Sequence, residues 1–188
     1  MKKKIIPLFL AAAVSVSGVL PIGAVQPVTV LAESGHPARL VDNAGLLDED
    51  EALELESKLD EISQEYDCDV VILTEETING AEPMDYADDY FDYEGYGMGE
   101  DNSGILFLIT MSERKWWIST HGEAIYDFTD AGQEYIAEQF QSDLSDGYYY
   151  DGFTTFADLC QEFIVQAQTG EPFDKGNLPE KPLSPWAL

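Results

Sequence analysis

The chain has 188 residues, with 9 Lys and Arg against 37 Asp and Glu, and so a formal net charge of −28. This length suits one domain with or without tails, and 45% apolar residues can supply a buried core. The charge excludes nucleic acids and anionic lipid surfaces as direct ligands, because both require a basic protein surface. Divalent cations or a basic protein partner would instead be attracted.

The first 32 residues have the pattern of an export signal. The three lysines Lys2–Lys4 precede an apolar stretch over residues 5–20, which ends before Pro21. Small residues occupy the −3 and −1 positions of a cleavage site after Ala32, with cleavage after Ala24 as the alternative. The apolar stretch is short for a membrane anchor. We therefore expect an exported, extracytoplasmic bacterial protein, either secreted or associated with the cell envelope.

Cleavage after Ala32 would leave a mature chain with six Lys and Arg against 37 acidic residues, a net charge of −31. Its cysteines are Cys68 and Cys160. An oxidising compartment would permit a disulfide between them. The position of Cys160 on an apolar helical stripe favours two buried free thiols instead.

The mature chain alternates helical patterns with short apolar runs. Asp48 and Glu51 have capping-box spacing at the start of the first helix, and the β-branched run over 69–74 is typical of a strand buried on both faces. These features predict a three-layer α/β/α sandwich with a mixed central sheet. In chain order, we expect a helix over 49–66, a strand over 69–74, a helix opened by Pro83, an antiparallel pair of strands over 105–109 and 115–120, a helix capped by Thr129 or Asp130, and a helix that ends at Gly170.

Four prolines in the last 18 residues predict that 171–188 is a Pro-rich tail or linker rather than a folded element. The expected organisation is therefore a signal peptide over 1–32, one α/β domain over 38–170, and this tail.

Several catalytic and binding motifs are missing from the sequence. It contains no G-x-S-x-G nucleophile elbow, Walker A loop, H-E-x-x-H or C-x-x-C motif, or EF-hand loop. The glycines Gly95, Gly97 and Gly99 are not a dinucleotide fingerprint, because Glu100 stands where a glycine is required and the run precedes a strand. No reaction type follows from these patterns.

Two acidic segments flank the predicted pair of strands. Asp101 and Asn102 precede its first strand, and Glu123, Asp127 and Asp130 follow its second. Because the strands run in opposite directions, the two segments should meet at one edge of the sheet. Carboxylate, amide and carbonyl oxygens suit a hard cation such as Ca²⁺. These five residues are therefore candidate ligands of a metal site at this edge of the sheet.

Each of these residues also has an ordinary structural interpretation. Asp130 can act as a helix N-cap, Asp101 and Asn102 can form a turn, and Asp127 can be a solvated charge. Asp60, on the surface of the predicted first helix, should take no part in the site.

Several blocks of the sequence resemble the TPM domain family, a family of exported or lumenal domains with thylakoid, photosystem-repair and receptor-modulating members. The matching blocks are 40–47, 91–110, Arg114-Lys115 with Ile118, 128–131 and 148–152. Together they cover about residues 38–170. One departure is His121-Gly122-Glu123-Ala124, where many members have a Gly-x-Gly-Leu-Glu turn. The departure weakens any transfer of a family role to Glu123.

The resemblance implies a Rossmann-like α/β/α sandwich. Some members bind calcium at the loop edge, and an acid phosphatase activity is ascribed to a plant member. Asp101, Asn102 and Asp130 match the family's acidic blocks, so the resemblance implies a Ca²⁺ site formed by these residues and, less directly, by Asp127.

Three functions remain open at this point. The first is a Ca²⁺-binding extracytoplasmic module that assists or modulates membrane or envelope proteins without catalysis. The second is a metal-dependent acid phosphatase, and the third is a purely structural envelope domain.

Overall fold

A five-stranded sheet forms the centre of the domain. The computed structural model describes residues 28–29 and 36–180. The strands are β1 (Val28–Thr29), β2 (Leu40–Asp42), β3 (Asp69–Glu75), β4 (Gly104–Thr110) and β5 (Lys115–His121), in the spatial order β1-β2-β3-β4-β5. β2, β3 and β4 run parallel, whereas β1 and β5 pair antiparallel with β2 and β4. The predicted mixed sheet is confirmed.

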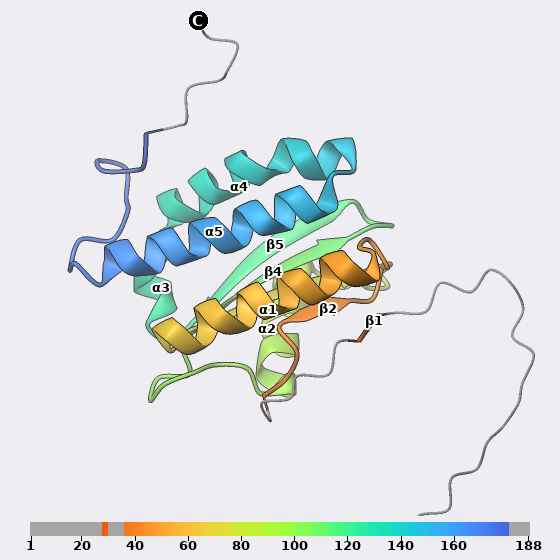
Figure 1. Ribbon diagram of the computed structural model, residues 1–188, viewed down its shortest axis with the longest axis horizontal. Helices are drawn as coiled ribbons and strands as arrows, with labels where there is room; N and C mark the ends of the chain where they lie inside the picture. Colours follow the sequence, from red (N-terminus) through yellow and green to blue (C-terminus); the bar gives the residue numbers. More distant parts are fainter. Residues whose placement is uncertain (1–27, 30–35, 181–188) are drawn as a thin grey trace, which may run out of the picture.

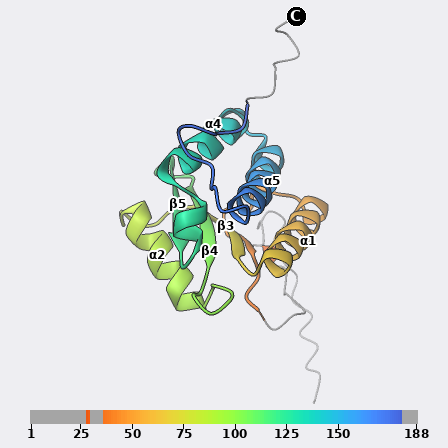
Figure 2. The same ribbon diagram turned by 90° about the vertical axis from the view of Figure 1, so that its left-hand side faces the viewer.

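Helices cover both faces of this sheet (Figures 1 and 2). The helices are α1 (Glu49–Tyr66), α2 (Pro83–Glu94), α3 (Ala124–Asp127), α4 (Asp130–Asp146) and α5 (Tyr149–Ala167). The larger core packs under α1, α4 and α5, and a smaller core packs under α2 on the opposite face. The predicted three-layer sandwich is therefore confirmed. The connections β2–α1–β3 and β3–α2–β4 both join neighbouring parallel strands and step across the sheet in the same direction, but α1 and α2 cover opposite faces. The two crossovers therefore have opposite handedness, and one of them is left-handed, against the usual right-handed rule.

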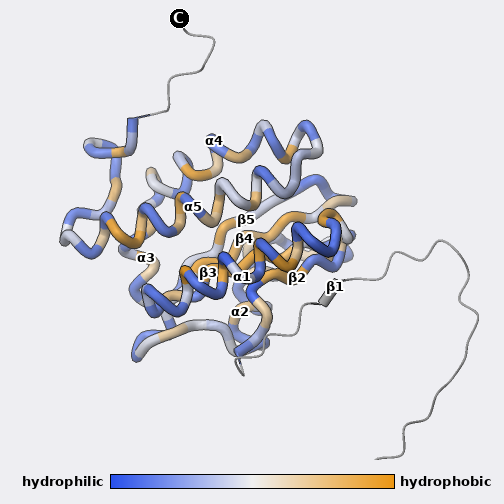
Figure 3. The backbone as a smooth tube through the Cα atoms, in the orientation of Figure 1, coloured by the Kyte–Doolittle hydropathy of each residue, from blue (hydrophilic) through white to orange (hydrophobic). Residues whose placement is uncertain are grey.

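The central strands are apolar on both faces because each face is covered by helices. Val70 and Ile72 of β3 face the larger core, and Val71 and Leu73 face the smaller one. The strands at the centre of the domain are correspondingly hydrophobic in Figure 3. A continuous β-branched run is the pattern that such a position requires.

Local capping signals define where the helices begin. Asp48 and Glu51 form the predicted capping box of α1, and Pro83 occupies the first turn of α2. Thr129, rather than Asp130, is the N-cap of α4, since its side chain accepts a hydrogen bond from the Gly132 N–H. Asp130 is the first residue of that helix.

The structure adds three short elements that the sequence pattern did not predict. β1, β2 and α3 have two, three and four residues, and such lengths carry no readable periodicity. β1 lies inside the predicted signal peptide, so cleavage after Ala24 would keep this strand and cleavage after Ala32 would remove it. The rest of the predicted signal peptide up to Ala32 lies outside the described residues.

Residues 171–180 form no helix or strand but pack against the domain. The ring centroid of Phe173 lies 4.8 Å from that of Phe163, and the Thr129 hydroxyl donates to the Phe173 carbonyl at 2.8 Å. The first part of the predicted tail, residues 171–180, therefore packs against the larger core. Residues 181–188 lie outside the described residues. Among the helices within residues 36–180, none combines the length and apolar character needed to cross a membrane.

Candidate functional site

The pairing of β4 with β5 sets two acidic segments side by side. Gly104 pairs with His121, so the loop before β4 lies against the turn after β5. The contact is close, because a Cβ on Gly122 would lie 2.5 Å from the Asp101 carbonyl oxygen. The Ala124 N–H donates to Ser103 Oγ at 3.0 Å, which ties α3 to the same loop.

A cavity of about 410 Å³ opens between these segments. We call it the acidic hollow. It lies at the amino ends of β3 and β4, and the last residues of α1 and α5 also line it. Its acidic lining residues are Asp67, Glu100, Asp101, Glu123 and Asp127.

Only part of the predicted metal set lines the acidic hollow. Asp101 and Asp127 do. Asn102 lies outside the lining, at a positive φ of 53° in the turn before β4. Asp130 is exposed at the start of α4 and also lies outside the lining. The family resemblance grouped four residues, but only two of them line the cavity, together with Glu123.

Burial changes the acidity of two groups in this cavity. Burial, followed by repulsion from Glu123, raises the pKa of the Asp127 carboxyl. Burial raises the pKa of the Cys68 thiol to about 12, so Cys68 is a neutral thiol at pH 7 rather than a thiolate ligand or nucleophile. Both Cys68 and Cys160 are buried and free.

The donor chemistry suits a hard cation, but the side chains do not converge. Carboxylates are good Ca²⁺ ligands, and two helix carboxyl-terminal ends, which carry partial negative charge, face the cavity without a basic residue in their last turns. Yet within the described residues, no group of three or more His, Cys, Asp or Glu side chains stands close enough to hold a metal ion. A cation at this position would require the exposed carboxylates to turn inward.

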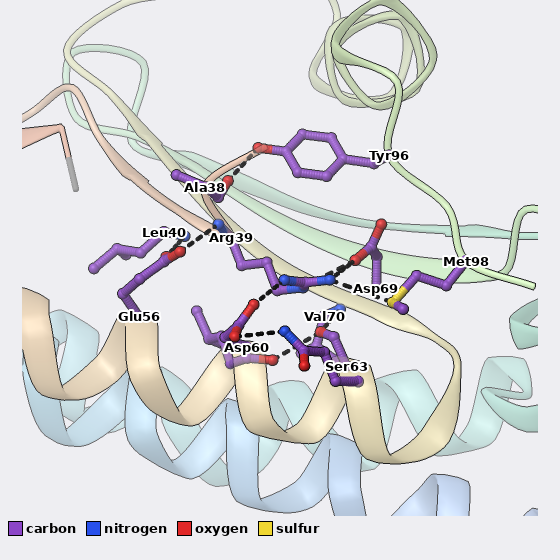
Figure 4. Close-up of polar contacts among 12 residues, drawn as sticks. Ala38, Arg39, Leu40, Glu56, Asp60, Ser63, Asp69, Val70, Tyr96 and Met98 are labelled. Carbon is purple, nitrogen blue, oxygen red and sulfur yellow. Dashed lines mark hydrogen bonds and ion pairs between the residues drawn. The ribbon is translucent and has the colours of Figure 1, made fainter. Parts of the chain in front are cut away.

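The glycine-rich loop beside the acidic hollow is held by a buried ion-pair network (Figure 4). The Arg39 side chain is fully buried. Its Nε donates to Asp69 Oδ1 at 2.9 Å, and its Nη2 donates to Met98 Sδ at 3.3 Å. The other oxygen of Asp69 accepts the Gly97 N–H at 2.7 Å. One guanidinium thus fixes the start of β3 and the loop over 95–104 together.

Asp60 of α1 belongs to this network and does not line the acidic hollow. Its carboxylate forms an ion pair with Arg39 Nη1 and also accepts from Gln64 at 2.7 Å. The available sequence signal was an arginine directly before the apolar Leu40-Val41 pair, in a chain with few cations. Helical periodicity gave no indication that Asp60 reaches it.

A second polar group lies between β5 and α2. Ser119 Oγ and His121 Nε2 are 2.9 Å apart, and His121 Nδ1 lies 3.9 Å from Asp92. The Ser119 hydroxyl donates to Asp88, and the imidazole stacks on Phe91 with ring centroids 3.9 Å apart. Burial lowers the pKa of His121. Since Ser119 is buried under α2 and its proton is engaged by Asp88, these contacts hold α2 onto the sheet rather than prepare a nucleophile.

Comparison with known proteins identifies the family. The TPM domain family matches residues 40–163, which is well over half of the chain. The chain belongs to the TPM domain family. It is also 30% identical over 118 residues to UPF0603 protein YdjH of Bacillus subtilis (strain 168), a match covering 63% of this chain. The match spans 44% of the length of that relative.

Three solved structures share the fold of this TPM domain. The N-terminal domain of a P. gingivalis protein has a TM-score of 0.61 at 17% identity, covering 73% of this chain and 87% of that one. The N-terminal domain of the cg2496 protein of Corynebacterium glutamicum has a TM-score of 0.56 at 12% identity, with 84% and 100% covered. The BA42 protein of Bizionia argentinensis has a TM-score of 0.55 at 15% identity, with 72% and 91% covered. At these identities the likeness shows the fold alone.

Proposed function

We propose that this TPM domain is an exported module that binds Ca²⁺ in the acidic hollow and assists or modulates a membrane or envelope protein without catalysis. The observation that carries the proposal is that five acidic residues and two helix carboxyl-terminal ends line one cavity. Both features place negative potential where a hard cation would bind.

The electrostatic free energy of the acidic hollow without a cation supports this assignment, because its ionised carboxylates are partly buried and repel one another. Asp127 is half-buried beside Glu123, and its pKa is raised by burial and by that neighbour. A cation would offset both penalties. Asp101, Glu123 and Asp127 are the residues proposed to hold it, because all three line the cavity. Asn102 and Asp130 are not in the proposed set, because neither faces it.

A non-catalytic role is favoured by the charge around the cavity. Among the described residues, no lysine or arginine lines the acidic hollow. Arg39, which lies near the neighbouring loop, is already engaged by Asp60 and Asp69. A phosphate ester would therefore face five carboxylates without a cationic side chain to hold it.

The proposed partner follows from the predicted export signal and from the charge. A chain with a net charge of −28 would be attracted to a basic surface on a membrane or envelope protein. It would be repelled by anionic lipid, so a protein is favoured over the bilayer as the binding surface.

Asp127→Asn is expected to raise stability in the absence of calcium and to reduce the stability that calcium adds. A carboxyl whose folded pKa is raised above its unfolded value stabilises the fold below the unfolded pKa and loses that contribution as the pH rises through the folded pKa. Asparagine resembles the protonated form, so at pH 7 without calcium the variant should melt higher than the parent. With millimolar Ca²⁺ in 150 mM NaCl, the parent should gain stability by RT ln(1 + [Ca²⁺]/Kd), and Asp127→Asn should gain less.

Calorimetric titration and melting curves measure both effects, with Asp50→Asn as the control. Asp50 is an exposed carboxylate in the first turn of α1, at the end of the helix away from the acidic hollow, so its variant should keep the parental calcium response. Equal calcium responses in all three proteins, or responses that depend only on ionic strength, would refute the metal site.

The phosphatase alternative is tested by hydrolysis of 4-nitrophenyl phosphate. We expect no turnover above a blank at pH 5 or pH 7 with Ca²⁺ or Mg²⁺, because the acidic hollow repels the substrate. Turnover that disappears in both Asp101→Ala and Asp127→Asn would instead establish the acidic hollow as a metal-dependent phosphatase site.

A further inference from the structure

A second cavity, also of about 410 Å³, lies at the opposite end of the sheet. It opens where β4 ends and β5 begins, against the last turns of α4 and the first turn of α5. Arg114, Lys115, Trp116, Gln141, Ser145 and Tyr149 are among the residues that line it. We call it the cationic pocket.

The charge of this pocket is opposite to that of the whole chain. In the part of the chain that the structure describes, no Asp or Glu lines it, although the chain has 37 such residues against 9 Lys and Arg. Within residues 36–180, the ion pairs involve Arg39, Lys58 and His121, and neither Arg114 nor Lys115 takes part in one. Two neighbouring cations therefore remain without a counter-ion.

The nearest acidic residue in the sequence is turned away from the pocket. Glu113 accepts the Thr77 hydroxyl at 2.6 Å and the Ile78 N–H at 3.2 Å, and hydrogen bonding to Thr77 lowers its pKa. Glu113 thus closes the loop after β3 and does not neutralise Arg114. Arg114 itself lies in the turn before β5 at a positive φ of 54°.

The aromatic side chains of Trp116 and Tyr149 line the pocket beside these cations and pack against phenylalanines of the larger core. Trp116 packs against Phe107 and Phe140, with ring centroids 6.4 and 6.1 Å apart, yet 37% of it stays exposed. Tyr149 packs against Phe153 at 6.3 Å. Gln141 and Ser145 add polar groups from α4. The pocket thus combines two free positive charges with supported aromatic surface.

We propose that the cationic pocket binds a small organic anion, with its anionic head group at Arg114 and Lys115 and an apolar, ring-sized body against Trp116 and Tyr149. The volume lies within the ordinary range of ligand pockets, and such pockets combine apolar walls with a few placed polar groups. The position also agrees with the general rule that ligands of α/β sheets bind outside the carboxyl ends of the parallel strands. The proposal does not depend on calcium binding, because the acidic hollow lies at the other end of β3 and β4.

The test uses phenylacetate and its neutral analogue 2-phenylethanol, with binding followed by backbone amide shifts in 150 mM NaCl. Phenylacetate should shift amides near residues 110–116 and 141–149 in a saturable way, and 2-phenylethanol should bind several-fold more weakly. Arg114→Gln and Lys115→Gln should each weaken phenylacetate binding about two- to fivefold, because both side chains are exposed and a charge pair with the carboxylate is screened by water. Lys175→Gln removes the same charge outside this pocket and should leave binding unchanged.

Two further probes identify the head group and the body. Phenyl phosphate replaces the carboxylate by a phosphate, and whichever aromatic anion binds more tightly names the preferred head group. Inorganic phosphate lacks the apolar body and should bind more weakly than both. The proposal is overturned if phenylacetate and phenyl phosphate cause no shifts at the pocket, if 2-phenylethanol binds as tightly as phenylacetate, or if inorganic phosphate binds as tightly as the aromatic anions. It is also overturned if the Lys175 variant loses as much affinity as the pocket variants.

Discussion

Replacing Arg39 with methionine is expected to lower the free energy of unfolding by about 3–5 kcal/mol. The guanidinium is fully buried and pairs with Asp69, whose side chain is only 4% exposed. Methionine fills much of the same volume but leaves the Asp69 carboxylate buried without its counter-charge. The loss should also loosen the loop over 95–104, because Asp69 holds the Gly97 N–H and Arg39 contacts Met98.

Lys58→Met is the matched control for this change. Lys58 forms an ion pair with Asp158 in which the two side chains are 34% and 57% exposed. Exposed pairs contribute about 0–1 kcal/mol, so this variant should unfold close to the parent in guanidinium chloride. If Arg39→Met costs no more than Lys58→Met, the buried network does not stabilise the domain.

Gly122→Ala is expected to cost about 2–4 kcal/mol, from left-handed backbone strain of about 1–2 kcal/mol together with a steric clash. Gly122 has a φ of 61°. An added Cβ would lie 2.5 Å from the Asp101 carbonyl oxygen and 2.9 Å from the Ser103 nitrogen. Both contacts are with backbone atoms, which no side-chain rotation can relieve. The turn after β5 would have to move away from the loop before β4, and the acidic hollow would open.

Gly147→Ala is the control for Gly122→Ala, because it introduces left-handed backbone strain without a steric clash. Gly147 has a φ of 85° at the end of α4, and an added Cβ would meet no atom within 4 Å. This variant should lose only the strain contribution, about 1–2 kcal/mol, and should keep the calcium response of the parent. Equal losses in the two glycine variants, measured by denaturant unfolding, would mean that the turn after β5 relaxes freely and that its contact with Asp101 is not tight.

Arg39→Met and Gly122→Ala both test how firmly the loop over 95–104 is held. Arg39 holds the loop over 95–104 against α1 and β3, and Gly122 allows the following turn to approach it. A loop that is fixed at both sides limits how far Asp101 and Glu123 can move toward Asp127. The rigidity of this edge therefore bears directly on whether a cation can draw the carboxylates together.

The sequence by itself determined the elements whose signals are local. Asp48 and Pro83 set the starts of α1 and α2, because capping and proline geometry act within one helical turn. Residues 70–73 of β3 and 105–109 of β4 are apolar at every position, which is expected only where both faces are covered. The layered fold and the antiparallel pairing of β4 with β5 follow from such patterns, whereas the TPM resemblance rests on several short sequence blocks that occur in the family's order.

Only the tertiary structure decided which charged residues meet. Asp127 and Asp130 are three residues apart, yet the one-turn helix α3 directs Asp127 into the acidic hollow and leaves Asp130 exposed at the start of α4. Arg39 and Asp60 are 21 residues apart, and Arg114 shares a pocket with Gln141 and Tyr149 from two later helices. Sequence periodicity does not predict which residue a charged side chain will pair with. The position of the partner depends on how whole helices and strands pack, not on the neighbouring residues in the chain.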